Sequence, residues 1–344
     1  MTELADRGPA TARDDDFMGR AEAFRPELLA HCYRMLGSVQ DAEDLVQETM
    51  LRAWRARDGF EGRSSLRTWL YRIATNVCLT ALEHRARRPM PSGLGAPSTN
   101  PEGPWPEALP ELAWMQPFPD HLAESEAADP ASIVAARAGM RLALVTALQY
   151  LHPRQRAALI LRDVLGWRAA EVADLLDVSV AAANSLLQRA RTRLEAVAPS
   201  SDDVAEPSDA GQRALLDRYA AAFEAADIDT LMDLLAEDVV WEMPPQIAWF
   251  QGRAAVGRLL GHRLRLHACG SPRARMVPVG ANGQAGFGVY FRGLDGVFRP
   301  QSVQVVTVVG DHISRVLAFR FPGVFELFGL PEELHLRHAE QCVS

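Results

Sequence analysis

The apolar positions of this chain change their spacing from segment to segment, and the spacing predicts three modules. From residue 24 to 88 they follow helical steps of three and four, and residues 132–196 continue that pattern. After residue 209, two or three helices give way to runs that alternate or are β-branched, at 286–291, 302–309 and 312–319. This order predicts two all-α modules followed by an α+β domain with an antiparallel sheet.

Two breaks separate the modules. Residues 89–130 contain ten prolines among scattered glycines and serines, a composition that sustains neither a helix nor a buried strand, so we expect a long extended linker. A shorter break runs from Pro199 to Pro207. The predicted organisation is a disordered tail at 1–20, helical modules at 21–88 and 131–197 around the linker at 89–130, a second linker at 198–208, the α+β domain at 209–330 and a tail at 331–344.

Charge and cysteine usage narrow the class of protein. The net charge of −8 argues against general binding of nucleic acid over the whole surface. One stretch is nevertheless basic, because its only acids are Glu61 and Glu83 and it contains Arg63, Arg67, Arg72, Arg85, Arg87 and Arg88. The cysteines have no metal-ligand spacing, so we expect reduced, mostly core thiols and neither metal nor cofactor, at Cys32, Cys78, Cys269 and Cys342. Without a secretory signal or a long apolar run, the chain is expected to be soluble, cytoplasmic and free of membrane contact.

An acidic helix is the first candidate binding element. Ala42, Leu45, Val46 and Ala53 share one face of it, while an exposed carboxylate row on another face carries Asp41, Asp44 and Glu48. Such a row suits a basic protein groove. Alternatively, acids in a first helical turn only complement the helix dipole.

The segment from Phe60 to Asn76 follows. Trp69, Arg72 and Asn76 lie at helical spacing, opposite the apolar stripe of the same helix. A ring, a guanidinium and an amide on one face can stack unpaired bases and hold a nucleic-acid backbone. The alternative is a core Trp69 beside solvated arginines; for the cluster as a whole we favour nucleic acid.

Residues 168–195 predict a helix-turn-helix. A short helix reaches Leu176, Asp177–Ser179 form a turn with Ser179 as N-cap, and a longer helix starts at Val180. Its apolar face steps through Ala183, Leu187, Ala190 and Leu194. The opposite face could enter a major groove, through Ser179, Ala181, Ala182, Asn184, Ser185, Gln188, Arg189 and Arg191. An ordinary helical hairpin is the alternative.

Three motifs carry a family resemblance. The stretches 41–54, 60–76 and 151–166 are similar to those of the group IV (extracytoplasmic-function) sigma factors of bacterial RNA polymerase. The resemblance implies binding to the core enzyme, at the clamp helices of its largest subunit and at the flap of its second-largest subunit. The residues that would contact the clamp helices are Asp41, Asp44, Leu45, Gln47 and Glu48. It further implies recognition of double-stranded promoter DNA. The −10 element would be recognised and melted by Arg63, Ser64, Arg67, Trp69, Arg72, Asn76, Arg85, Arg87 and Arg88, and the −35 element read by the helix at 180–193.

Residues 209–320 resemble the SnoaL-like branch of the NTF2 fold, a cone of bent sheet closed by helices; the signal is the stretch 215–244 followed by 250–253. Related sigma factors with this extension are thought to use it as a built-in regulator. Their aromatic-proline linker motif is resembled by Trp114-Met-Gln-Pro-Phe-Pro-Asp120, and we expect this regulatory motif to pack on the third module through Trp114, Pro117, Phe118, Pro119 and Asp120.

The third module could also hold a small ligand. A pocket in the cone would be lined by Tyr219, Trp241, Glu242, Trp249, His312 and Arg320. A buried carboxylate such as Glu242 could act as a base, but no acid–base pair stands out, so we expect no catalytic residues and no enzyme activity. The competing functions are a helix-turn-helix regulator with a ligand-sensing SnoaL-like domain, and an enzyme with a helical extension.

Overall fold

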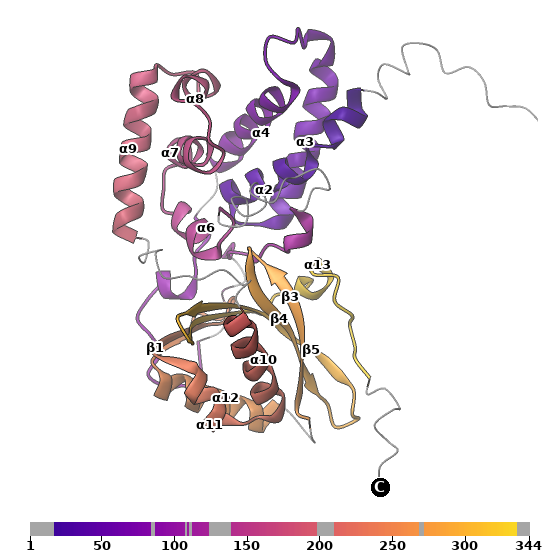
Figure 1. Cartoon of the computed structure of the whole chain (residues 1–344), viewed down its shortest axis with the longest axis vertical. Helices are drawn as coiled ribbons and strands as arrows, with labels where there is room; N and C mark the ends of the chain where they lie inside the picture. Colours follow the sequence, from indigo (N-terminus) through magenta and orange to yellow (C-terminus); the bar gives the residue numbers. More distant parts are fainter. Residues whose placement is uncertain are drawn as a thin grey trace, which may run out of the picture. The chain divides into compact units, whose positions relative to one another are not determined.

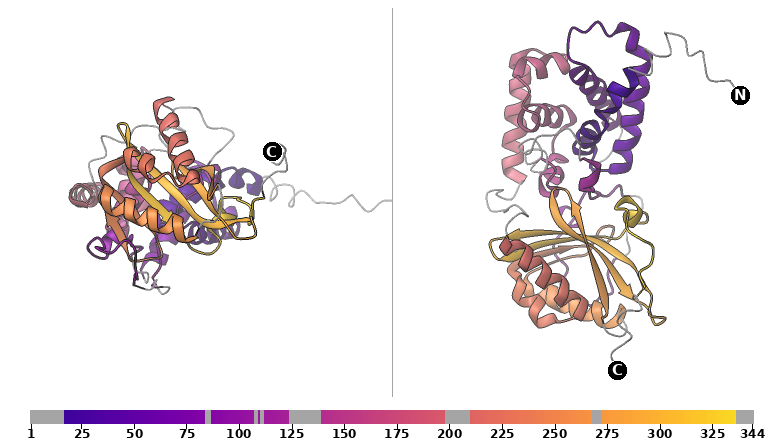
Figure 2. Two further views of the ribbon diagram at one scale, coloured as in Figure 1. Left: turned by 90° about the horizontal axis from the view of Figure 1, so that it is seen from below. Right: turned by 45° about the vertical axis from the view of Figure 1, so that its right-hand side comes forward.

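The computed structural model describes residues 17–83, 87–106, 109, 112–123, 139–197, 210–267 and 272–335. The chain forms two compact units, one from residues 1–87 and 121–198 and the other from residues 88–120 and 199–344. The segment from Arg88 to Asp120 therefore groups with the C-terminal residues and not with the helical modules that it joins in sequence. Figures 1 and 2 draw both units.

The first half of unit 1 contains α2 (Arg25–Leu36), α3 (Val39–Ala56) and α4 (Leu66–Leu82). Helix α2 ends where Gly37 adopts a left-handed conformation (φ 71°) and its N–H binds the Tyr33 carbonyl at 2.7 Å. Serine side chains cap the other two, because Ser38 Oγ accepts from the Asp41 N–H and Ser65 Oγ from the Thr68 N–H. Local sequence signals thus set the boundaries of this bundle.

The second half of unit 1 contains α6 (Leu142–Leu148), α7 (Pro153–Leu159), a π-helical turn (Ile160–Val164), α8 (Ala169–Leu175) and α9 (Val180–Val197). Between α8 and α9 the chain turns at Asp177 (φ 52°), and Ser179 Oγ accepts from the Ala182 N–H at 3.1 Å. Ala183, Leu187 and Ala190 are buried, and Leu194 is half-buried. The predicted helix-turn-helix is confirmed in its elements, its cap and its buried face.

Unit 2 is built on one six-stranded sheet in the order β2-β1-β6-β5-β4-β3. Its elements are α10 (Ala210–Ala225), α11 (Ile228–Leu234), β1 (Leu235–Glu242), β2 (Trp249–Gln251), α12 (Arg253–His267), β3 (Ala274–Ala281), β4 (Gln284–Arg292), β5 (Phe298–Val309), β6 (His312–Phe319) and α13 (Val324–Leu327). Helices α10, α11 and α12 cover the inner face of the bent sheet (Figures 1 and 2). The expected cone of sheet and helices is confirmed.

The sheet departs from the prediction at one pair of strands. All neighbours are antiparallel except β1 and β6, which run parallel. A parallel pair needs a long connection, and here the whole of β2, α12 and β3 to β5 lies between the two strands in the chain. The sheet is therefore mixed.

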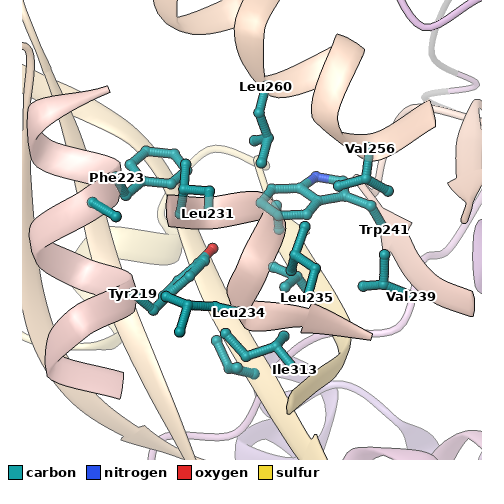
Figure 3. Close-up of a cluster of buried hydrophobic side chains, with 14 of the residues drawn as sticks. Tyr219, Phe223, Leu231, Leu234, Leu235, Val239, Trp241, Val256, Leu260 and Ile313 are labelled. Atoms are coloured by element: carbon teal, nitrogen blue, oxygen red, sulfur yellow. The ribbon is translucent and has the colours of Figure 1, made fainter. Parts of the chain in front are cut away.

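The core of unit 2 lies between the helices and the sheet. Tyr219 and Phe223 of α10 face Trp241 of β1 and Leu260 of α12, with Leu231 beside them (Figure 3). Tyr219 is fully buried and its hydroxyl donates to Gln304 Oε1 at 2.8 Å, so its polar atom is satisfied inside the core.

The segment 89–123 is not a free extended linker. It forms two 3₁₀ turns, Pro91–Gly93 and Asp120–Leu122, and buries Met90, Met115 and Phe118. The composition excluded long regular elements correctly, but apolar side chains between the prolines allow the segment to pack without them. The rest of the predicted linker, residues 107–108, 110–111 and 124–130, lies outside the described residues, as do 1–16, 198–208 and 336–344 of the predicted tails and second linker.

Of the cysteines, Cys32 and Cys78 are buried free thiols, and Cys269 and Cys342 lie outside the described residues. Contact with Cys32 and burial raise the pKa of the Cys78 thiol. No helix in the described ranges is long and apolar enough to cross a membrane.

Candidate functional site

Helix α3 presents the predicted acidic face to solvent. Asp44 and Gln47 are exposed, whereas Asp41, Leu45 and Glu48 are partly exposed. The opposite face is fixed in the bundle by Ala42, Val46, Thr49, Met50 and Ala53, all buried. Glu48 forms a salt bridge within its own helix, to Arg52 at 2.6 Å.

One apolar residue of this face was missed by sequence reasoning. Leu51 is 50% exposed and follows Asp44 and Glu48 at helical steps of seven and three. An exposed leucine beside a carboxylate row can supply apolar area to a contact that the acids orient. The signal in the sequence was a leucine on the polar side of an amphipathic helix.

The predicted −10 residues from Arg63 to Asn76 lie in α4 or just before it. Arg63, Ser64 and Asn76 are exposed. Trp69 is half-buried and packs on Phe60, with ring centroids 5.1 Å apart. The ring expected to stack on bases therefore already has an aromatic partner.

The arginines of the same set contact protein groups. Arg67 binds Glu27 at 2.7 Å within the first bundle. Arg72 donates to the Asp174 carbonyl at 2.8 Å and forms an ion pair with the Asp174 carboxylate of α8. The Arg87 guanidinium lies 4.1 Å from the ring centroid of Tyr150. Arg88 belongs to unit 2, where it donates to the Trp114 carbonyl at 2.8 Å, and Arg85 lies outside the described residues.

Two buried arginines join the halves of unit 1. The Arg34 Nε donates to the Gly139 carbonyl at 3.0 Å. Arg156 of α7 donates to the Met35 carbonyl at the end of α2 and to Gln149 Oε1 at 2.8 Å. Burial lowers the pKa of Arg34 and of Arg156 to about 10, so both stay charged at neutral pH. Charge-assisted bonds to carbonyls thus hold the second helical half against the first.

Helix α9 presents the predicted −35 face. Six residues are exposed, namely Ser179, Ala181, Asn184, Ser185, Gln188 and Arg189. Ala182 is half-buried, and the exposed Arg191 forms a two-pronged ion pair with Asp163, at 3.0 and 2.7 Å. Val180, which sequence reasoning did not select, is 46% exposed at the start of the helix, where a methyl group could contact thymine.

The predicted linker motif binds the β3–β4 turn in unit 2. The Phe118 N–H donates to Asn282 Oδ1 and the Asn282 N–H donates to the Phe118 carbonyl, each at 2.8 Å. Asp120 Oδ1 accepts from the Gly283 N–H at 2.7 Å, and Pro119 bridges to Ala281. We call this arrangement, residues 118–120 with 281–283, the linker clamp. Beside it, Trp114 and Pro117 are buried.

The linker contacts the sheet at a second place. Glu242, fully buried, accepts from the Ser92 N–H at 2.9 Å and pairs with Arg315 at 2.8 Å. The Trp249 indole donates to the Gly95 carbonyl at 2.9 Å. These two residues were expected in the cone pocket. They hold the linker instead. Side chains alternate along a strand, so Glu242 lies on the opposite face of β1 from Val239 and Trp241, which are in the core.

The cone contains a cavity of about 40 Å³. Of the six predicted pocket residues, Trp241 and Arg320 line the cavity. Tyr219 is not in the lining, but its hydroxyl donates a hydrogen bond to the lining residue Gln304. His312 does not line it, because it starts β6 at the hairpin turn, where its ring contacts Asp311. Arg263 of α12 is a lining residue that sequence reasoning missed; only the fold brings it to Arg320.

Comparisons with known proteins agree with this architecture. Residues 21–88 match the family Sigma-70 region 2, residues 141–194 match Sigma-70, region 4, and residues 216–322 match the SnoaL-like domain. The chain is 50% identical over 335 residues to the ECF RNA polymerase sigma factor SigG of Mycobacterium tuberculosis, covering 97% of this chain and 89% of SigG.

A second relative is the ECF RNA polymerase sigma factor SigJ of the same organism, 32% identical over 282 residues, which are 80% of this chain and 81% of SigJ. The crystal structure of SigJ superposes with a TM-score of 0.58 at 26% identity, covering 91% of this chain and 99% of that one. The chain therefore belongs to the ECF RNA polymerase sigma factors, and it carries a SnoaL-like domain after its two sigma regions.

Proposed function

We propose that this sigma factor docks on core RNA polymerase through the exposed face of α3 and directs the enzyme to promoters. The −10 element would be bound and melted around α4 and the −35 element read by α9. The SnoaL-like domain and the linker clamp regulate this activity by holding the two sigma regions together. The acids and Leu51 of α3 support the first part, because a carboxylate row with an exposed leucine beside it fits a basic protein groove better than a nucleic acid.

The observation that carries the regulatory part is the contact between Arg72 and Asp174. It joins α4, the helix for the −10 element, to α8, which packs beside α9. Two promoter elements named for positions about 25 base pairs apart are separated by roughly 85 Å along B-DNA, at about 3.4 Å per base pair. Sigma regions in direct contact cannot reach both elements at once. Promoter binding therefore requires them to separate and Arg72 to be released.

The linker can control that separation. Residues 88–120 number 33 (120 − 88 + 1), and fully extended they span about 110 Å, at roughly 3.3 Å per residue. A released linker is long enough for the promoter spacing. A linker held by Asn282, Gly283 and Glu242 follows the surface of the sheet instead. Docking on the SnoaL-like domain thus shortens the reach between the sigma regions.

The SnoaL-like domain fits a regulatory role better than a catalytic one. Its buried carboxylate, Glu242, is neutralised by Arg315 and bound to the linker, so it is not placed to take a proton from a ligand in the cavity. A small ligand bound in the cone could instead bias the docking of the linker. Neither sigma region alone defines the promoter sequence, so a set of candidate promoters is tested.

Run-off transcription tests the proposal. Core polymerase is mixed with the full chain or with a chain ending at Pro207, on candidate promoters. We expect specific initiation by the full chain and a different activity for the shortened one, which lacks the sheet that the linker binds. Equal activity of the two chains would contradict the regulatory role. Failure of either chain to bind core polymerase would contradict the proposed docking and favour a DNA-binding regulator.

A further inference from the structure

The cavity of the SnoaL-like domain combines an apolar wall with two arginines. Phe223, Trp241 and Leu260, which face one another in Figure 3, belong to its lining. Arg263 of α12 and Arg320, which follows β6, complete it. The lining contains no aspartate or glutamate among the residues that the structure describes. This combination of cations and apolar surface suits an organic anion.

The two guanidiniums are close enough to repel each other. Burial, together with the charge of Arg320, lowers the pKa of Arg263 to about 10, and burial also lowers the pKa of Arg320. Both groups remain charged at neutral pH. No carboxylate of the described residues pairs with Arg320, whose backbone N–H binds the Pro244 carbonyl. An anion between the two guanidiniums would relieve their repulsion and replace the water that burial removed.

The size of the cavity limits the ligand. A volume of 40 Å³ holds about three water-sized spheres, at roughly 10–15 Å³ each. This matches a ligand of a few heavy atoms. An inorganic oxyanion would fill the charged end but would leave Trp241 and Phe223 against polar oxygens.

We propose that this cavity binds a short-chain carboxylate, with its head between Arg263 and Arg320 and its apolar tail against Trp241 and Phe223. The assignment deepens the ligand-sensing part of the proposed function by naming the class of ligand. A planar carboxylate accepts paired hydrogen bonds from guanidinium groups, and Ser302 and Gln304 add neutral polar groups to the same lining.

The site also reaches the linker. The Arg263 guanidinium lies 4.4 Å from the ring centroid of Trp105, a linker residue whose ring packs on Phe250 of β2. A carboxylate that draws Arg263 into the cavity weakens this cation–π contact. The ligand thus acts on the linker through one side chain.

Calorimetric titration of the full chain tests the site, with sodium propionate, propionamide and inorganic phosphate at constant ionic strength. We expect propionate to bind at least tenfold more tightly than its neutral isostere propionamide, and more tightly than phosphate. Arg320→Gln and Arg263→Gln should each weaken propionate binding at least tenfold. Arg320→Lys, which keeps the charge but loses the paired donors, should bind propionate more tightly than Arg320→Gln and less tightly than the unaltered chain. Arg258→Gln, at an exposed position of α12 outside the lining, should stay within twofold.

Equal binding of propionate and propionamide, or no saturable binding of either, would overturn the assignment. Tighter binding of phosphate would overturn the choice of a carboxylate, and an Arg320→Gln chain that binds like Arg258→Gln would overturn the site. The circular dichroism of each variant shows whether it folds; if Arg320→Gln does not fold, the ratio of propionate to propionamide affinity in the unaltered chain still decides. Because these titrations contain neither polymerase nor DNA, failure here leaves the transcription experiment unaffected.

Discussion

Asn282 combines a backbone and a side-chain role at one position. It is fully buried in the two-residue β3–β4 turn with φ 57°, a left-handed conformation that asparagine and glycine tolerate. Its Oδ1 accepts the Phe118 N–H, so the linker clamp depends on this side chain. The two roles can be separated by substitution.

Asn282→Gly should weaken the linker clamp without straining the turn. Glycine keeps the left-handed backbone and loses the acceptor of the Phe118 N–H, a loss of about 1 kcal/mol or more. We expect earlier proteolytic cleavage in residues 88–120 and altered run-off transcription. Asn282→Asp retains an acceptor and is the matched control; identical behaviour of the two variants would exclude the side chain as the anchor.

His31 makes the first sigma region sensitive to acid. The ring is fully buried, with Nε2 2.9 Å from Thr75 Oγ1 and the Tyr71 ring beside it. Burial, with Arg34 nearby, lowers the pKa of His31 from 6.5 to about 3. Between pH 6.5 and about 3, His31 is therefore neutral in the folded state and protonated in the unfolded chain. The free energy of unfolding consequently falls as the pH drops below 6.5.

Between pH 6.5 and 5 this residue should reduce the free energy of unfolding by about 2 kcal/mol, at roughly 1.4 kcal/mol per pH unit. Denaturant unfolding of the full chain at both pH values measures the loss. His31→Gln should remove that part of the pH dependence, whereas His121→Gln, at an exposed position, should keep it. A slope unchanged in His31→Gln would show that another group causes it.

At the scale of single elements, the polar face of α3 is the surface that we propose binds core polymerase. Asp44 is exposed and Leu51 half exposed, and neither is part of the bundle core. Changes at these positions should therefore act on binding and leave the fold intact.

Asp44→Lys should weaken binding to core polymerase at least tenfold, because it places a cation in the carboxylate row, and Leu51→Ala should weaken it severalfold by removing apolar area. A pull-down or fluorescence titration with core enzyme measures both. Asp58→Lys makes the same charge change at an exposed position beyond the end of α3. Equal loss in Asp58→Lys would mean that net charge, and not this face, governs the interaction.

The elements that could be predicted from sequence are those with local signals. The α8–α9 pair follows from the Ser179 cap and the steps of its apolar face, and β4, β5 and β6 follow from their β-branched runs. Strands β1 and β3 were missed, since Leu235–Glu242 carries acids on its exposed positions and Ala274–Ala281 contains a proline. The parallel pairing of β1 with β6 has no local signal, because the partners are far apart in the chain.

The site residues divide in the same way. Exposure of the α3 and α9 faces follows from helical periodicity, and the linker motif was expected to pack on the third module, where Phe118 and Asp120 do bind. The partners of Arg72 and Glu242 depend on tertiary contacts over 102 and 150 residues, which no local pattern records. Sequence reasoning therefore predicted which side chains are exposed better than it predicted tertiary contacts.

At the scale of the whole molecule, buried groups help to hold the two halves of unit 1 together. Arg156 is 3% exposed and connects α7 to the end of α2, and the rings of Tyr71 and Trp167 meet at 5.7 Å. Such an interface can open as a unit when its charged bonds are lost. Opening is what simultaneous binding of two promoter elements requires.

Arg156→Met should favour the open form, because hydrogen bonds from a charged donor contribute about 1.5–3 kcal/mol each and their buried carbonyls lose a partner. Small-angle X-ray scattering should give a larger radius of gyration and promoter binding should be stronger. Arg154→Met is the control, since Arg154 donates to Leu176 within the second sigma region alone. An unchanged radius of gyration in Arg156→Met would show that other contacts hold the regions together.

The linker clamp joins Phe118 to Asn282, which are 164 residues apart in the chain. A ribosome adding about 5–20 residues per second needs roughly 10 to 30 seconds to make that stretch, and domains fold as they emerge. Both sigma regions are therefore complete before the turn that binds their linker exists. In each newly made molecule the linker stays undocked until the β3–β4 turn has been synthesised. The rate of translation therefore sets how long this undocked interval lasts.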